Sequence, residues 1–353
     1  MRRSYGSAQQ APPPPGLPAT PGLPWWRVRG SPDSLDGRTV IPQSVPCAGA
    51  RRSHPWGLGR VYSSGSPNSK TGCSVGLANP PERIRVIFHP SDFSESSDVA
   101  FAHALKIALV TGSTLNVLHV AEKGNADWSD FPGVRSTLER WRLIPKGSPK
   151  SAVGQLGIDV VKVIASSKNP VRASLGFLRN HPADLIVLAV HQQEGRMRWL
   201  EKRVGEPIAR GADEMALYIP HGVEGFVSRK DGSVSLGNIL VPVANKPSAQ
   251  PAVDAVARLI RNLQLPLGKV TLLHVGPAPE APALSIPHDT RWTWTRMAAD
   301  GAPAEVILQK ADETAAELIV MTTEGPHGFL DGLRGSTSEQ VLRSARCPVA
   351  NLP

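Results

Sequence analysis

Residues 183–187 read Ala-Asp-Leu-Ile-Val, and residues 316–320 read Ala-Glu-Leu-Ile-Val, at an offset of 133 residues. Residues 206–210 and 339–343 match at the same offset. The later parts of the two halves are therefore one sequence written twice, and this duplication decides the fold. Comparing the copies position by position shows what chemistry each has kept, and it predicts that a ligand site lies in the second copy.

The first 80 residues differ in composition from the rest of the chain. They hold 13 of the 34 prolines and 11 of the 32 glycines, with no glutamate and no apolar period. Such a segment cannot bury enough apolar surface to offset the entropy of ordering it, so we predict a disordered tail. An organelle transit peptide would share its lack of acidic residues but not its proline content. The sequence leaves open whether the mature protein contains this tail.

The basic charge of the chain belongs to that tail. Residues 1–80 contain nine Arg and Lys against two Asp, a net charge of +7, which leaves +2 of the total of +9 for the remainder. The charge therefore gives no indication of a nucleic-acid-binding fold. No apolar stretch approaches the roughly 18 residues that a membrane span needs. Three scattered cysteines without a CxxC pair are typical of a reducing cytoplasm, which we take as the location.

Strand and helix patterns alternate in both copies. In the first, we expect strands at 84–88, 114–120, 160–165 and 185–190, and helices at 99–110, 134–141 and 171–180. In the second, we expect strands at 239–243, 270–275, 292–297, 318–322 and 349–352, and helices at 251–263, 304–315 and 336–345. Strands separated by helices predict βαβ crossovers and an α/β fold with parallel sheets covered on both faces.

The second copy is shorter than the first after its second strand. The offset between copies is 155 at His119 and His274 and 133 farther on, which is a loss of 22 residues. In the first copy this space holds the helix expected at 134–141. We therefore predict that the second copy lacks one crossover helix. Because both histidines recur at equivalent strand ends, we predict a packing role for them.

A helix start in the second copy carries residues suited to binding phosphate. Gly335, Ser336 and Thr337 directly precede or begin the helix, whose free N–H groups and positive dipole end favour anions. Gly325 lies in the loop after the fourth strand, at the edge where doubly wound sheets bind ligands. Ser336 and Glu339 also match a capping box, which explains the same residues without a ligand.

Together these features resemble the universal stress protein family in its tandem two-domain form. The resemblance covers about residues 83–353 and rests on residues 90–95 (Pro-Ser-Asp-Phe-Ser-Glu), on Leu-His-Val at both second strands, and on Gly325-x9-Gly335-Ser336. It implies domains at 81–222 and 223–353 after the tail at 1–80. Each would be doubly wound, with a mainly parallel five-stranded sheet flanked by helices, like the adenine nucleotide α-hydrolases.

Many members of this family dimerise through the last strand. The resemblance therefore implies that the two copies pair as an internal pseudo-dimer, and it leaves a further homodimer open.

The nucleotide-binding branch of the family has a G-x2-G-x9-G-(S/T) loop for phosphate and ribose, and an Asp after the first strand for adenine. The second copy keeps the later part of the loop but has Thr322 at its first glycine and Ala244 in place of the Asp. In the first copy Asp92 is present, and the loop positions are replaced instead. The replacing residues are Gln192, Lys202, Arg203 and Val204.

The resemblance thus implies a site for ATP, with Mg²⁺, in the second copy. Its residues would be Val243 and Val275 at the base, with Thr322, Gly325, Gly335, Ser336 and Thr337 around the ribose and phosphates. No residue is predicted to be catalytic, and no residue is predicted to bind a metal ion directly.

Three functions are consistent with these residues. The first is a non-catalytic, nucleotide-binding regulatory protein of the stress response, which we prefer because Gly335 and Ser336 are intact. The second is a family member that binds no nucleotide and acts through unknown protein partners. The third is a weak ATPase; against an enzyme, the chain has no HIGH-like tetrapeptide and no SGGxDS phosphate loop. The stress signal and the partners cannot be read from the sequence.

Overall fold

The computed structural model describes residues 84–121, 127–190, 214–288, 291–323 and 337–353. The first half of the chain supplies strands β1 Val86–Pro90, β2 Thr114–Ala121, β3 Asp159–Ser166, β4 Leu185–Val190 and β5 Met215–Pro220, and helices α1 Glu95–Thr111, α2 Val134–Arg140, α3 Ser151–Gly154 and α4 Pro170–Asn180. The second supplies β6 Asn238–Val243, β7 Gly268–Val275, β8 Trp292–Ala299, β9 Leu318–Thr322 and β10 Val349–Leu352, and helices α6 Gln250–Asn262, α7 Pro303–Glu313 and α9 Thr337–Ser344. Two 3₁₀ turns, η1 Trp128–Asp130 and η3 Ala278–Glu280, complete the described elements.

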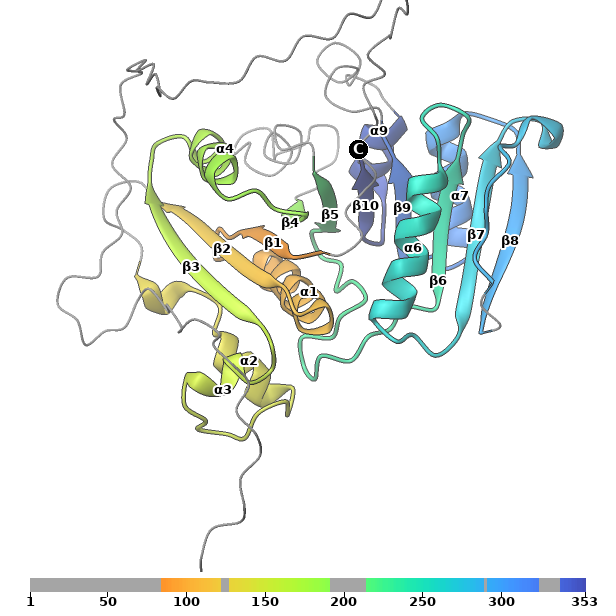
Figure 1. The fold of residues 1–353 in the computed structure, drawn as a ribbon. Helices are drawn as coiled ribbons and strands as arrows, with labels where there is room; N and C mark the ends of the chain where they lie inside the picture. The colour runs from red at the N-terminus through yellow and green to blue at the C-terminus, as the bar shows by residue number, and fades with distance from the viewer. Residues whose placement is uncertain (1–83, 122–126, 191–213, 289–290, 324–336) are drawn as a thin grey trace, which may run out of the picture.

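The strands form one ten-stranded sheet that runs through both halves (Figure 1). Its order is β3-β2-β1-β4-β5-β10-β9-β6-β7-β8, so each half repeats the same order about the central pair. The last strands of the two halves, β5 and β10, pair antiparallel, a direction that the sequence analysis did not give, and the other neighbouring strands pair parallel. The carboxyl ends of the strands therefore point in opposite directions in the two halves.

The expected strands and helices are present, with boundaries shifted by a few residues. α1 begins at Glu95, four residues earlier than predicted, because the Ser94 hydroxyl caps it by accepting the N–H of Ser97 at 3.2 Å. It ends at Gly112, whose φ of 63° is the left-handed conformation common at helix ends. The sequence analysis gave no bounds for β5 or α3.

The acidic residue of the repeated stretch makes equivalent hydrogen bonds in each half. The Asp184 carboxylate accepts two backbone N–H groups at the start of β1, from Arg85 at 2.7 Å and Val86 at 2.9 Å. Its counterpart Glu317 accepts the equivalent pair at the start of β6, from Gly237 and Asn238, at 2.5 and 3.1 Å. A carboxylate that accepts two backbone N–H groups makes strong, charge-assisted bonds. The acidic residue of the repeat therefore locks the fourth strand beside the first.

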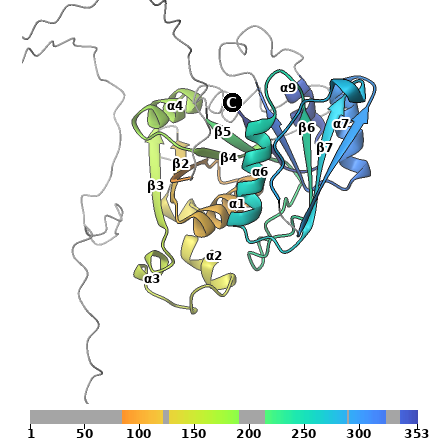
Figure 2. The same cartoon turned by 45° about the vertical axis from the view of Figure 1, so that its right-hand side comes forward.

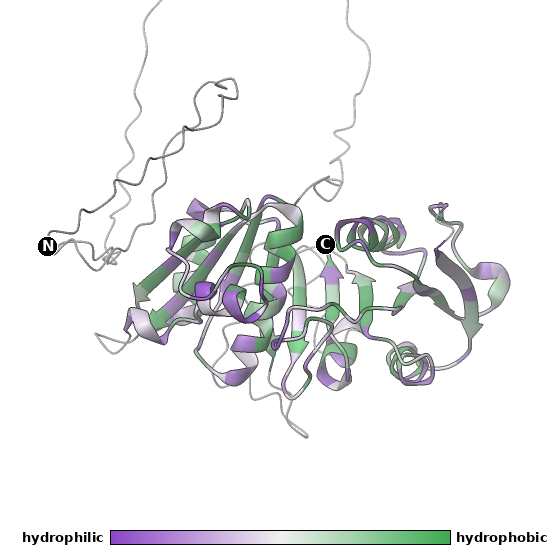
Figure 3. Ribbon diagram, turned by 90° about the horizontal axis from the view of Figure 1, so that it is seen from below, coloured by the Kyte–Doolittle hydropathy of each residue, from purple (hydrophilic) through white to green (hydrophobic). Residues whose placement is uncertain are grey.

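Helices cover the sheet on both faces, and one core joins the halves. α1 and α6 lie side by side on the same face (Figure 2), and a single apolar cluster includes buried residues from both. On the other face, α4 covers the first half and α7 and α9 cover the second, in two separate clusters. Apolar residues dominate the strands, and polar residues face outward from the helices (Figure 3). Leu342 of α9 packs against both clusters of that face.

The crossover between the second and third strands differs between halves. In the first half it contains α2 and α3; in the second, the described residues between β7 and β8 contain only η3. There the chain runs along α6, where Gln250 and Ser285 exchange two hydrogen bonds of 2.9 and 3.0 Å. Leu284 and Ile286 pack against the core. The predicted loss of the helix expected at 134–141 is confirmed for these residues, and α3 has no counterpart among them either. The side chains of Leu284 and Ile286 cover this part of the core instead.

A buried histidine attaches the segment between the halves to α1. His103 donates from Nδ1 to the carbonyl of Val99 at 2.8 Å, so its Nε2 is an acceptor. That atom accepts the N–H groups of Phe226 at 3.0 Å and Val227 at 3.1 Å. Burial lowers the pKa of His103 to about 4. The neutral ring therefore fixes the position of the linker, and Gly225 (φ 69°) gives it the close approach it needs.

Candidate functional site

The carboxyl edge of the second half contains the point where the chain reverses its direction across the sheet. From β6 the chain adds β7 and β8 on one side, and then returns to β9 and β10 on the other. The register of β6 on β9 pairs Ile239 with Leu318 and, continued along the strands, brings Val243 level with Thr322. Such a switch point is where open α/β sheets bind ligands.

The described residues of the predicted site gather at this edge. Val243 is buried, while Thr322 and the neighbouring Val275 are half-buried. Thr337 is the first described residue of α9 and is also half-buried. Gly325, Gly335 and Ser336 lie outside the described residues, and so does the predicted capping box at Ser336.

The recurring histidines make the same bond in both halves. His119 Nδ1 donates to the carbonyl of Ser91 at 2.8 Å, and His274 Nδ1 donates to the carbonyl of Val243 at 3.2 Å. Ser91 and Val243 are equivalent at the offset of 152. Each histidine therefore ties the end of its second strand to the end of its first, which accords with the predicted packing role.

Aromatic rings fill the corresponding edge of the first half. Phe93 stacks on His119 with ring centroids 3.8 Å apart, and Phe131 contacts Phe93 edge-on at 5.1 Å. Trp128 stacks on Phe131 at 5.7 Å, and the Lys162 ammonium lies 5.5 Å from the Phe131 ring centre. We call this group, Phe93, His119, Trp128 and Phe131, the aromatic cluster. It occupies the ends of β1 and β2, the place that corresponds to Val243 and Val275.

Asp92 is turned toward its own loop. Its Oδ1 accepts the N–H of Ser94 at 3.0 Å, in a turn that leads into α1. The backbone of Phe93 between them has a φ of 63°, a left-handed conformation that is uncommon for an aromatic residue. The replaced loop positions of the first half, Gln192, Lys202, Arg203 and Val204, lie outside the described residues.

The second half has no counterpart of the aromatic cluster among its described residues. Asn245 is equivalent to Phe93, and its amide donates to the carbonyl of Glu280 at 3.0 Å. No ring is stacked on His274 in the part of the chain that is described. Within the described part of the chain, the Nε2 atom of His274 is buried and has no hydrogen-bond partner.

Sequence reasoning missed a second group of polar side chains in the first half. Ser96 Oγ lies 2.5 Å from His221 Nδ1, and the fully buried His89 donates from Nδ1 to the carbonyl of Val187 at 2.8 Å. Burial lowers the pKa of His89 to about 4. These bonds join α1 to β5 and β1 to β4. Because the partners are about a hundred residues apart in sequence, no local pattern signals them.

No helix of the described residues is both long and apolar enough to cross a bilayer. No cluster of three or more His, Cys, Asp or Glu side chains in those ranges is arranged to hold a metal ion.

The fold and this edge define a class: tandem doubly wound α/β units with the strand order 3-2-1-4-5, open at a switch point. The chain matches the universal stress protein family over residues 84–220 and 293–353. That is more than half of its length, and the chain belongs to this family.

Individual relatives agree with the family assignment. A universal stress protein of Methanocaldococcus jannaschii is 44% identical over 50 residues, which span 14% of this chain and 29% of the relative. The crystal structure of a universal stress protein from Archaeoglobus fulgidus is 18% identical, covers 76% of this chain and 97% of its own, and has a TM-score of 0.50. A protein of unknown function from Pseudomonas aeruginosa PAO1 is 15% identical over 76% of this chain and 92% of its own, also with a TM-score of 0.50. At these identities the solved structures show the fold alone.

Proposed function

We propose that this universal stress protein is a non-catalytic regulator that binds an adenine nucleotide, ATP with Mg²⁺, at the carboxyl edge of its second half. The observation that carries the proposal is the position of Val243 and Thr322 at the carboxyl ends of β6 and β9, the neighbouring strands at the switch point. Beside them begins α9, which Gly335 and Ser336 precede in sequence. The helix start would supply N–H groups and Thr337 a hydroxyl to the phosphates.

The differences between the halves support a site in the second half only. In the first half the aromatic cluster occupies the place for the base, and Asp92 is bonded within its own loop. In the second half Asn245 replaces Phe93, and Ala244 replaces Asp92.

We favour a signalling role that depends on nucleotide occupancy, because the chain has neither a HIGH-like tetrapeptide nor an SGGxDS phosphate loop. We place the protein in the cytoplasm, where ATP is abundant and thiols such as buried Cys347 stay reduced. Its protein partners would bind differently to the nucleotide-bound and the nucleotide-free form of the second half.

A thermal-shift titration of the full chain with ATP·Mg²⁺, ADP and AMP tests the proposal. A ligand that binds only the folded state raises the apparent melting temperature by mass action. We expect a rise with ATP that Gly335→Val abolishes, because a side chain there blocks the approach of phosphate to the backbone. Lys202→Val, which places valine at the equivalent position of the first half, should leave the rise in melting temperature with ATP intact.

If chain freed of bound ligand shows no rise with any nucleotide, the proposal fails. The family member that acts through protein contacts alone then becomes the better account. Release of phosphate at a rate above that of the Gly335→Val variant would instead support the weak ATPase.

A further inference from the structure

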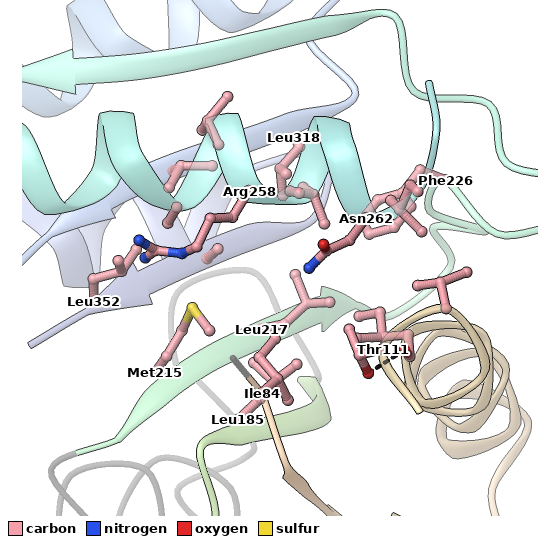
Figure 4. A pocket seen from close by; sticks show the side chains of 18 residues that line it. Ile84, Thr111, Leu185, Met215, Leu217, Phe226, Arg258, Asn262, Leu318 and Leu352 are labelled. Atoms are coloured by element: carbon pink, nitrogen blue, oxygen red, sulfur yellow. Dashed lines mark hydrogen bonds between the residues drawn. The ribbon is translucent and has the colours of Figure 1, made fainter. Parts of the chain in front are cut away.

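The seam between the two halves covers the last strand of each. β5 and β10 pair there, and α1 and α6 pack above them around an apolar cavity of about 80 Å³, with Arg258 at one side (Figure 4). This cavity belongs to the core that both halves share. The strands left at the two ends of the described sheet are therefore β3 in the first half and β8 in the second.

The backbone of β8 presents hydrogen-bonding groups away from the sheet that it ends (Figure 1). The carbonyls of Arg291 and Ala299 accept N–H groups from the two ends of β7, at 3.3 and 2.9 Å. Because backbone groups alternate in direction along a strand, the residues between these two positions that carry even numbers direct theirs away from β7. They are Trp292, Trp294, Arg296 and Ala298. Within the described part of the chain no strand pairs with that side, and such an edge is a template for another strand.

The two end strands differ in how their charged side chains are placed. Lys162 in the middle of β3 is half-buried, and its ammonium lies 5.5 Å from the centre of the Phe131 ring, in the segment before α2. A charged residue turned inward is one way in which edge strands avoid pairing. Arg296, the charged residue of β8, is exposed, and its guanidinium reaches the carbonyl of Leu284 at 3.4 Å. A guanidinium has five N–H donors, so Arg296 can make further contacts.

The sequence of β8 is complementary to itself when two copies run antiparallel. With Thr295 on the two-fold axis, residues 292–298 pair throughout, and the outward backbone groups of one copy meet those of the other. Trp294 then lies opposite Arg296 of the other copy, and this pair occurs twice. Tryptophan is the ring that binds cations best, and opposite residues of antiparallel strands are close enough for such a contact.

Neighbouring registers are less favourable. An axis at Arg296 would set two arginines opposite each other, and like charges in that position destabilise a strand pair. An axis at Trp294 would pair a shorter part of β8, because the strand begins at Trp292. The register about Thr295 is therefore the one that uses most of the strand without a like-charge pair.

The charge and the size of this edge determine how strong such a dimer would be. The chain after residue 80 has a net charge of only +2, so two copies repel each other weakly. One pair of eight-residue strands covers less than the roughly 1,200 Å² of a stable protein interface. The expected dimer is therefore weak and depends on protein concentration.

We propose that β8 is a dimerisation edge, at which two copies of this chain pair antiparallel about Thr295 and continue the sheet from one copy into the other. The dimer would bring two second halves side by side. β7 separates β8 from the switch point between β6 and β9, so the proposal does not depend on nucleotide binding.

Cysteine cross-linking tests the register. Thr295→Cys is introduced into the full chain together with Cys47→Ser and Cys73→Ser, while the buried Cys347 is kept. Dimer formation during mild oxidation with diamide is followed on non-reducing gels. Two residues that face each other in a non-hydrogen-bonded pair have Cα atoms about 4.5 Å apart, within the range of about 4.4–6.8 Å for disulfides.

Thr293→Cys in the same background is the matched control, because in this register Thr293 faces Met297 of the other copy rather than itself. Thr293 is exposed and Thr295 is half-buried, so random collisions would favour a cross-link through Thr293→Cys. We expect Thr295→Cys to cross-link at least about tenfold faster, since a disulfide needs close Cα atoms. Equal rates, or a faster cross-link through Thr293→Cys, overturn the proposal.

Light scattering of the native full chain measures the association itself. The mass should rise from 37.7 kDa toward twice that value as the protein concentration increases. Arg296→Gln should raise the dissociation constant about tenfold, because each dimer loses two contacts between a cation and a ring. Arg142→Gln, the same change at an exposed arginine of the first half, should keep the native constant.

A native chain that keeps the mass of one copy up to about 1 mM overturns the proposal. The edge of β8 then belongs to a different occupant, such as a strand of another protein or residues 1–80. Equal weakening in Arg296→Gln and Arg142→Gln also overturns it. Gly335→Val should dimerise as the native chain does, so a failure of the nucleotide proposal leaves this result unaffected.

Discussion

The two halves share a sheet order but differ at their carboxyl edges. In the first half Phe93 closes the edge by stacking on His119, and in the second Asn245 stands in its place and bonds to a neighbouring loop. The residues that join strands to each other recur, as Asp184 and Glu317 show. A duplicated fold needs its strand-joining contacts in both copies, whereas its edge is free to diverge.

The largest expected effect is a pH dependence that comes from the first half. Burial lowers the pKa values of His89 and His103 to about 4, from 6.5 in an unfolded chain. Between these values the unfolded chain binds protons that the folded chain excludes, so stability is complete above pH 6.5 and falls toward pH 4. We expect a loss of about 3 kcal/mol for each histidine, measured by urea unfolding at pH 7, 5.5 and 4.5.

His103→Gln should remove about half of the fall in unfolding free energy between pH 7 and pH 4.5. An unchanged slope in this variant would show that His103 does not exclude protons in the folded chain.

His103→Leu at pH 7 should be the most damaging single substitution of those considered. It leaves the buried N–H groups of Phe226 and Val227 without an acceptor, at about 1–3 kcal/mol each. We expect a loss of about 2–5 kcal/mol in the free energy of unfolding. His274→Leu in the second half removes one bond to Val243 and should cost only about 1–2 kcal/mol; equal losses would contradict the linker role of His103.

Substitutions at Phe93 and Asn245 test whether these edge residues decide which half binds the nucleotide. Phe93→Ala removes a half-buried ring from the aromatic cluster and should cost about 2 kcal/mol of stability. Its effect on nucleotide affinity should be negligible. Asn245→Phe should close the second half and lower ATP affinity about tenfold, roughly 1.4 kcal/mol, measured by titration calorimetry. Undiminished binding in Asn245→Phe would place the base elsewhere.

Restoring the missing carboxylate should increase the difference in ATP affinity between the two halves. Ala244 is exposed and stands where the first half has Asp92. Ala244→Asp should raise the affinity for ATP about fivefold to tenfold, because a charged acceptor adds about 1–1.4 kcal/mol. GTP, which lacks the amino group at that position, serves as the comparison ligand and should gain nothing.

The smallest effect is expected at Asp92 itself. Asp92→Ala removes one exposed bond to the N–H of Ser94 and should cost about 0.5–1 kcal/mol of stability. Nucleotide affinity should not change. Loss of binding in this variant would move the site to the first half.

Much of the fold could be predicted from the sequence because its signals are local. Apolar, β-rich runs predicted the strands and helical spacing predicted the helices, both within a few residues, and the change of offset predicted the lost crossover helix. The prolines that begin α4 and α7 mark the same helix start in both halves. The candidate site was predicted as a set of strand ends, and Val243, Val275 and Thr322 end β6, β7 and β9; their role in binding stays a prediction.

The contacts that distinguish the halves could not be predicted in this way. The bonds of His103 to the linker span more than 120 residues, and the ring contacts of the aromatic cluster depend on how two loops meet above adjacent strands. No spacing in the sequence encodes such distances.

The sequence by itself determined the duplication, the alternation of strands and helices, and the loss of loop glycines from the first copy, because each is a property of neighbouring residues or of direct repetition. Only the tertiary structure decided that Phe93 covers His119, that His103 holds the linker, and that α1 and α6 enclose a cavity with Arg258 at its side. These features bring together side chains from distant parts of the chain, and such packing depends on three-dimensional shape.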